Sequence, residues 1–213
     1  MQRLRTSFSR GEELKFLSHL DLMRLWERAF RRAGISLASS EGFTPHPRIS
    51  LAAPLSVGTT GQAELMDVFL SGWTSPDSFV SQVKKQLPRG MTISDVRSVG
   101  LSSPSLQSQV SFAEYNVQIE TEMKVCEVES AIKSLLSSAE IPWQHLRDTG
   151  VRHYDLRPLV DDLWHIELHG SLCTLGMRLR CSSNGTGRPE QVTKALGFSQ
   201  RPRSIHRTRL ILS

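Results

Sequence analysis

The chain has 213 residues, of which 38% are hydrophobic and 22% are charged, and its formal net charge is +5. The length suits one large domain or two small ones, and the composition is ordinary for a globular protein. No apolar run reaches the roughly 18 residues that a membrane-spanning helix needs, and residues 1–10 lack the apolar stretch of a secretory signal. These features give no sign of a membrane-spanning helix, and we expect a cytoplasmic protein.

The first half of the sequence alternates between strand and helix patterns. The predicted elements are, in chain order, strand 2–9, helix 18–33, strands 35–40, 49–55 and 62–70, helix 76–87 and strand 91–99. The first helix has the clearest signals, because Ser18 can cap its start and Gly34 can end it. Residues 100–109, GLSSPSLQSQ, are rich in serine and have no periodicity, which is typical of a linker.

The second half repeats this order. Its predicted elements are strand 110–120, helix 124–138, strands 151–156, 163–169 and 172–181, helix 189–196 and strand 203–212. Both halves therefore have the split βαβ order of the ferredoxin-like fold, with an extra hairpin strand. We predict an α+β protein of tandem ferredoxin-like domains with antiparallel sheets, the domains being 1–99 and 110–213 with a linker at 100–109.

Two histidines and an arginine near the first helix form a candidate catalytic set. His19 falls on the apolar side of the helical wheel, so we expect it to point toward the sheet. The loop EGFTPHPR, residues 41–48, is stiffened by two prolines and presents Phe43, His46 and Arg48. His19, His46 and Arg48 could perform metal-free general acid–base chemistry on a phosphodiester. The alternative is that His19 only packs at the rim of the core.

Arginines form a second kind of candidate site. On the first helix, Arg24 and Arg28 lie on the polar face, opposite the apolar stripe. The C-terminal arginines share odd parity and would project from one face of a strand: Arg201, Arg203, Arg207 and Arg209. Such a row suits a phosphate backbone or an acidic partner, although it could equally be a solvated edge that blocks strand pairing.

Metal and cofactor motifs are missing from the sequence. Cys126, Cys173 and Cys181 are odd in number and have no C-x-x-C spacing, which predicts neither a disulfide framework nor a zinc or iron–sulfur site. Glycine-rich phosphate loops and an H-E-x-x-H motif are also absent. We therefore expect no metal and no cofactor in this chain.

The run SHLDLMRLWERAFRRAG, followed by EGFTPHPRISLAAPLSVG, resembles the bacterial radical SAM-linked family DUF2344. The segment VRHYDLRPL at 151–159 resembles that family's tyrosine–aspartate–arginine–proline segment. This second resemblance makes Tyr154, Asp155 and Arg157 candidates for substrate contact or for a structural brace between the domains. Members occur beside, or fused to, a radical SAM protein. The resemblance thus implies a radical SAM partner, which would hold the iron–sulfur cluster and SAM.

Three functions remain open on this basis. The favoured one is an accessory or substrate-presenting module that works with a radical SAM enzyme in tRNA or rRNA modification or processing. The second is an autonomous metal-free enzyme similar to the RAMP endoribonucleases, which also have tandem ferredoxin-like domains, with His19 and His46 as its catalytic groups. The third is a structural adaptor.

Overall fold

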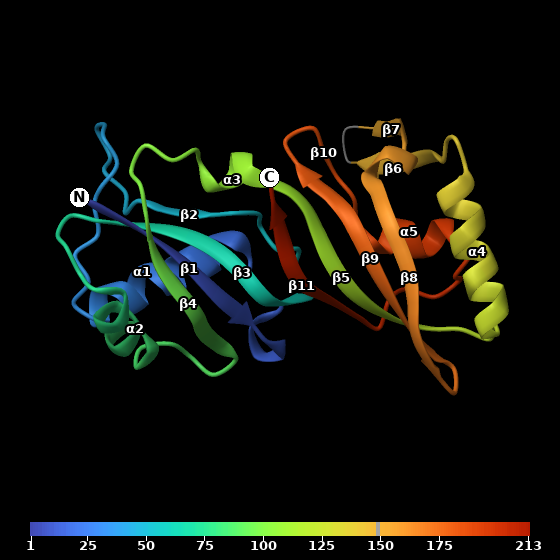
Figure 1. Cartoon of the computed structure of the whole chain (residues 1–213), viewed down its shortest axis with the longest axis horizontal. Helices are drawn as coiled ribbons and strands as arrows, with labels where there is room; N and C mark the ends of the chain where they lie inside the picture. The colour runs from blue at the N-terminus through green and yellow to red at the C-terminus, as the bar shows by residue number, and fades with distance from the viewer. Residues whose placement is uncertain (148–149) are drawn as a thin grey trace. The chain divides into compact units, whose positions relative to one another are not determined.

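The computed structural model describes residues 1–147 and 150–213 and divides into two compact units (Figure 1). Unit 1 comprises Met1–Val110 together with Leu212–Ser213, and unit 2 comprises Ser111–Ile211. Each unit is an antiparallel sheet with helices packed against it, so the predicted α+β, tandem ferredoxin-like fold is confirmed. Among the described residues, no helix is long and apolar enough to cross a membrane.

Unit 1 has the full split βαβ order. Its elements are β1 (Gln2–Arg10), α1 (His19–Arg32), β2 (Ile49–Leu51), β3 (Thr59–Leu70), α2 (Pro76–Lys84), β4 (Met91–Val99) and the short α3 (Leu106–Gln109), with a 3-10 turn η1 (Glu12–Leu14) after β1. The strands lie in the order β4-β1-β3-β2, and every neighbouring pair is antiparallel. This is the strand order that a ferredoxin-like unit requires.

Aromatic rings hold α1 and α2 to one face of this sheet. Trp26 of α1 is fully buried, meets Phe8 of β1 edge-on at a centroid distance of 5.1 Å, and stacks on Phe30 at 5.3 Å. Phe30 in turn lies 5.6 Å from Phe79 of α2. Because such pairs add to the hydrophobic gain of burial, this row fixes where α1 lies and which side of it faces solvent.

The ends of α1 follow the sequence signals. The Ser18 hydroxyl accepts a hydrogen bond from the backbone N–H of Asp21 at 3.2 Å, and Gly34 after the helix has a φ of 70°, which glycine adopts at no cost. The predicted strand at 35–40 is wrong. This segment makes two isolated bridges and then turns away into the loop at 41–48, so it is too short to build a strand.

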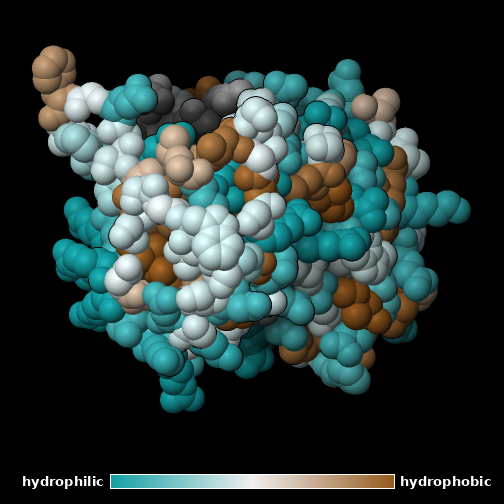
Figure 2. Space-filling model, turned by 60° about the vertical axis from the view of Figure 1, so that its left-hand side comes forward, coloured by the Kyte–Doolittle hydropathy of each residue, from teal (hydrophilic) through white to brown (hydrophobic). Residues whose placement is uncertain are grey.

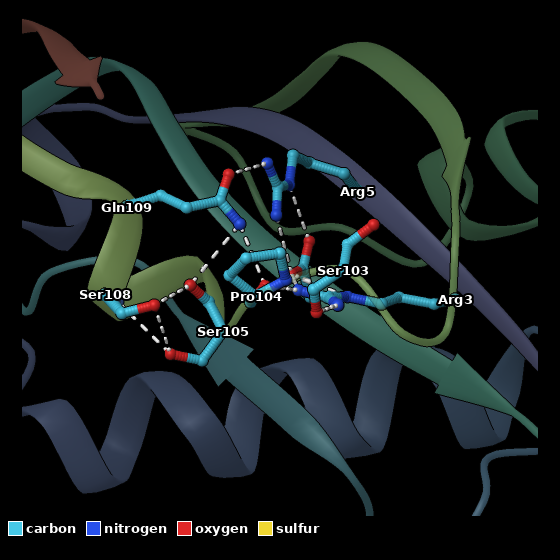
Figure 3. Close-up of polar contacts among 8 residues, drawn as sticks. Arg3, Arg5, Ser103, Pro104, Ser105, Ser108 and Gln109 are labelled. Atoms are coloured by element: carbon cyan, nitrogen blue, oxygen red, sulfur yellow. Dashed lines mark hydrogen bonds and ion pairs between the residues drawn. The ribbon is translucent and has the colours of Figure 1, made fainter.

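The opposite face of the unit 1 sheet carries a buried charge cluster (Figure 3). Asp67 of β3 accepts hydrogen bonds from Arg3 at 2.6 and 3.0 Å and from Arg5 at 2.9 and 3.1 Å, and all three residues are at most 5% exposed. Arg3 also donates to the carbonyls of Ser103 and Pro104 at 2.7 and 2.8 Å. Residues 100–109, predicted as a linker, are therefore tied to unit 1 and include α3.

Unit 2 repeats the order with an inserted hairpin. Its elements are β5 (Val110–Glu120), α4 (Val125–Ser137), β6 (Pro142–Arg147), β7 (Gly150–Asp155), the 3-10 turn η2 (Arg157–Leu159), β8 (Val160–His169), β9 (Leu172–Ser182), β10 (Gly185–Thr186), α5 (Pro189–Ala195) and β11 (Ser204–Leu212). The main strands lie in the order β11-β5-β9-β8, β10 pairs with β9, and β6 and β7 form a separate two-stranded sheet. Sequence analysis located β7 but missed β6.

Candidate nucleic-acid interface

The solvent face of α1 is a row of cations. Packing of the apolar stripe against the sheet turns the remaining positions outward, and Arg24, Arg28, Arg31 and Arg32 are all exposed. The loop that follows α2 adds the exposed Lys85, which sequence reasoning missed. The Lys84–Lys85 pair at the end of the predicted second helix was the signal that could have pointed to it.

Two hollows flank this row, and Arg28 lines both of them. The first has a volume of about 400 Å³ and is lined by Leu25, Arg28, Ala29, Arg32, Lys85, Gln86, Leu87 and Pro88. The second has a volume of about 420 Å³ and is lined by Glu27, Arg28, Arg31, Gly34, Ile35, Ser36, Leu37 and Pro47. We call Arg28, Arg31, Arg32 and Lys85 the α1 cationic surface. It is therefore indented and not flat.

In the described part of the chain, the cations of this surface form no ion pair. Within the part of the chain that the structure describes, no carboxylate oxygen lies within 4.0 Å of a charged nitrogen of the α1 cationic surface. Arg24 is different, because its guanidinium lies 3.8 Å from Asp21. Glu27 is the one acidic residue that lines either hollow. The surface can thus accept the negative charge of a ligand without first losing an ion pair.

His19 and His46 do not form a catalytic pair. His19 begins α1 and is exposed, contrary to the expectation that it would point to the sheet, because the first turn extends beyond the edge of the core. His46 is exposed beside Pro47, which lines a hollow with the residues that follow the helix. The 14 residues of α1 place about 20 Å of helix between these two positions. One substrate atom cannot reach both imidazoles.

Arg48 is held in a structural position. Its guanidinium lies over the ring of Phe69 at 4.3 Å and donates to the sulfur of Met1 at 3.6 Å. The preceding loop leaves Phe43 completely exposed, and the Ser40 hydroxyl accepts a hydrogen bond from the His46 backbone N–H at 3.0 Å. The loop therefore presents one aromatic ring to solvent, with Arg48 at its base.

The C-terminal arginines do not form the predicted free row. Arg201 and Arg203 precede β11, and Arg203 lies 3.6 Å from Glu120. Arg207 is only 2% exposed, so it belongs to the interior. Arg209 donates to both carboxylate oxygens of Glu114, at 2.7 and 3.0 Å. The strand itself was predicted correctly. The parity of the arginines could not show that Arg203 and Arg209 pair with carboxylates or that Arg207 is buried.

Glu114 is the centre of this network on the sheet of unit 2. Hydrogen bonding from Arg209, opposed by burial and reinforced by Arg178 at 3.0 Å, holds the pKa of the Glu114 carboxyl below its usual value. Arg178 also donates to Asp161 at 3.4 Å. Arg209 and Arg178 thus neutralise the buried Glu114 carboxylate.

The tyrosine–aspartate–arginine segment braces unit 2 internally. The Asp155 carboxylate accepts from the backbone N–H groups of Ile141 and Arg157, at 2.7 and 2.9 Å. Arg157 donates to the carbonyls of Val160 and Leu136, at 2.6 and 2.9 Å. The Tyr154 hydroxyl donates to the Gln191 side chain at 2.8 Å. Each side chain is thus bonded within its own unit.

Among the described residues, no group of three His, Cys, Asp or Glu side chains is placed to hold a metal ion. None of the three cysteines forms a disulfide, and burial raises the pKa of the Cys173 thiol.

Residues 3–189 match the model of a family described as uncharacterized protein conserved in bacteria, DUF2344. The chain belongs to DUF2344. No curated protein matches the sequence. The family's description gives no activity, so the function of this DUF2344 protein has to be argued from its own residues.

Several solved structures share the fold. A Cbf5-Nop10-Gar1 complex matches with 10% identity and a TM-score of 0.53, over 98% of this chain and 48% of that one. An H/ACA RNP bound to a substrate RNA containing 2'-deoxyuridine matches with 11% identity and a TM-score of 0.51, over 98% and 47%. An archaeal box H/ACA sRNP Nop10-Cbf5 complex matches with 11% identity and a TM-score of 0.50, over 99% of this chain and 48% of that one. The DUF2344 chain spans about half the length of these chains, and the likeness shows the fold alone.

Proposed function

We propose that this DUF2344 protein is an RNA-binding accessory or substrate-presenting module that works with a radical SAM enzyme. The observation that carries the proposal is the α1 cationic surface, where four exposed cations line two hollows and have no carboxylate partner among the described residues. Unpaired cations of this kind favour nucleic-acid binding, because each one that contacts a phosphate releases counterions from the nucleic acid and so adds to the binding free energy.

Arginine suits this role better than lysine. Its planar guanidinium can make two parallel hydrogen bonds to one phosphate, which fixes the register of a backbone on the surface. Arg28 stands between the two hollows, so a backbone that crosses it passes from one hollow to the other. The hollows give phosphates a place to approach three arginines and Lys85 closely.

Two further considerations support the proposal. The solved structures of similar fold include an H/ACA RNP bound to a substrate RNA. The radical SAM partner comes from the resemblance of the α1 region and of the 41–48 loop to the radical SAM-linked family. We place both proteins in the cytoplasm and assign the iron–sulfur cluster and SAM to the partner.

The RNA part is tested by measuring tRNA and rRNA-fragment binding at a low and a high salt concentration. The Arg28→Ala/Arg32→Ala variant should bind more weakly and lower the salt slope by about 1.4–1.8, since each phosphate contact contributes about 0.7–0.9. The matched control is Arg89→Ala/Arg203→Ala, which also removes two charges, but from arginines that already lie 3.2 Å from Glu13 and 3.6 Å from Glu120. Absence of binding at low salt would refute the proposal.

The same samples address the competing enzyme hypothesis. RNA that is cleaved by wild type but left intact by His46→Ala would favour an autonomous ribonuclease. The radical SAM partnership needs its own experiment, in which the two proteins are co-expressed and their complex is measured by size-exclusion chromatography. Separate elution at micromolar concentration, with and without RNA, would remove the partner from the proposal.

A further inference from the structure

Two exposed aromatic side chains lie on loops whose neighbouring residues line the second hollow. Phe43 is fully exposed and Trp73 is 79% exposed. Neither ring takes part in an aromatic or cation–π contact among the described residues. Two aromatic rings at exposed loop positions near a cationic surface offer stacking faces to a ligand.

The loop that carries Phe43 is built to hold its tip in place. Ser39 and Pro47 form a bridge, and the Ser40 backbone N–H donates to the His46 carbonyl at 2.8 Å, which closes the loop at its base. At the tip, Gly42 has a φ of 129°, a conformation that favours glycine. Phe43 therefore projects from a closed, proline-stiffened loop, so little conformational entropy is lost when a ligand stacks on it.

The segment that carries Trp73 is also anchored on both sides. The Ser71 backbone N–H donates to the Ser36 carbonyl at 3.0 Å. The Thr74 backbone N–H donates to the Gln2 side chain at 2.8 Å, and that side chain returns a hydrogen bond to the Thr74 carbonyl at 3.0 Å. Trp73 thus projects from a short connection that is fixed to the start of β1 and to the segment after α1.

Both segments start at the wall of one hollow. Ser36 and Pro47 line the second hollow of the α1 cationic surface, together with Arg28 and Arg31. Trp73 lies two residues after Ser71, whose backbone N–H donates to the Ser36 carbonyl. The loop that carries Phe43 closes at the bridge between Ser39 and Pro47. In Figure 1 the 41–48 loop, the connection from β3 to α2 and the N-terminus lie at the same end of unit 1. The segments that carry the two rings are therefore anchored at residues beside the cations of the second hollow.

From this juxtaposition we infer that the site binds a single-stranded RNA segment, whose phosphates contact the α1 cationic surface while its unstacked bases stack on Phe43 and Trp73. The inference rests on the proposed function and names its substrate class. Cations alone would not favour a single strand, because a duplex presents phosphates at higher charge density. Exposed aromatic rings select the single strand, since only unpaired bases have free faces to stack.

A protein partner is the competing occupant, and the surface argues against it. Figure 2 shows hydrophobic residues as small separate patches between hydrophilic ones, whereas a protein-docking surface has a contiguous apolar core. Isolated aromatic side chains flanked by arginines are the composition of single-strand binding grooves.

The test uses fluorescein-labelled oligouridine, oligoadenosine and the duplex that they form, with binding followed by fluorescence anisotropy. Wild type should bind the single strands at least about tenfold more tightly than the duplex. Phe43→Ala and Trp73→Ala should each weaken single-strand binding by about 5-fold to 150-fold, the range measured for loss of one base stack, and change duplex binding by less than about twofold. Trp73→Phe keeps a stacking face and should stay close to wild type.

Phe16→Ala is the matched control, because Phe16 is also an exposed aromatic, at 73%, but precedes the opposite end of α1. If the Arg28→Ala/Arg32→Ala variant loses RNA while the aromatic variants bind like wild type, the single-strand inference fails and the proposed function stands. If no RNA binds, both fail. If the aromatic variants lose the radical SAM complex but not RNA, the site docks a protein and the inference is overturned.

Discussion

Asp67→Asn tests the physical account of unit 1 most directly. The carboxylate of Asp67 accepts four hydrogen bonds from two guanidinium groups, and the three residues are at most 5% exposed. An asparagine there keeps the shape but removes the negative charge, and its amide N–H groups would face the guanidinium of Arg3 or of Arg5. Breaking a buried ion pair by neutralising one partner costs about 3–5 kcal/mol.

That loss is large against the roughly 5–15 kcal/mol that stabilises a typical domain. With a urea m-value of about 1.5 kcal/mol/M, the unfolding midpoint of unit 1 should fall by roughly 2–3 M. Circular dichroism and tryptophan fluorescence would follow it, since Trp26 is fully buried in unit 1. The control is Asp95→Asn on β4, where the carboxylate is exposed. An Asp67→Asn midpoint within about 0.5 M of the control would refute the role assigned to the cluster.

Three further predictions concern unit 2. Glu114→Gln should lower the free energy of unfolding at neutral pH, because hydrogen bonds from two arginines keep the folded-state pKa of Glu114 below its unfolded-state pKa. The difference from wild type should therefore shrink as the pH falls below the ordinary glutamate pKa of about 4.3. A difference that is constant with pH would contradict this. Cys126 should react with a thiol reagent in the native protein, whereas Cys173 should react only on unfolding; mass spectrometry of the modified peptides decides, and native labelling of Cys173 would count against its burial. Gly176→Ala should destabilise the protein by about 1–3 kcal/mol, because a methyl group there would overlap the indole of Trp164. Gly72→Ala has open space around it and serves as the control in thermal unfolding. Equal melting temperatures of the two variants would show that the indole moves aside freely.

The fold could be predicted because its determinants are local. The cap at Ser18, the glycine at 34 and the alternation of β1 and β5 each specify an element from a few neighbouring residues, and the order of those elements then specifies the topology. The strand β6 was missed because it belongs to an inserted hairpin whose pairing with β7 is visible only in three dimensions.

The candidate site was predictable only in part, because contacts between residues distant along the chain cannot be read from the sequence. The helical period places Arg28 outward, so a solvent-facing cation could be named from the sequence. Whether a cation remains free depends on partners that are distant along the chain: Arg209 meets Glu114, which is 95 residues away. Periodicity could not show that Arg207 would be buried, or that Ser36 and Pro47 would line the same hollow as Arg28.

The bonds from Arg3 to the carbonyls of Ser103 and Pro104 decide where unit 1 can be cut. A fragment that stops at Val99 would remove two acceptors of the Arg3 guanidinium and leave it bonded, among the described residues, to Asp67 alone. It would also remove the Gln109 side chain, whose oxygen accepts from Arg5 at 3.2 Å. The serine-rich stretch after β4 is thus the last structural piece of the first half and not a spacer before the second. For anyone expressing that half alone, Val110 and not Val99 is the sensible C-terminus.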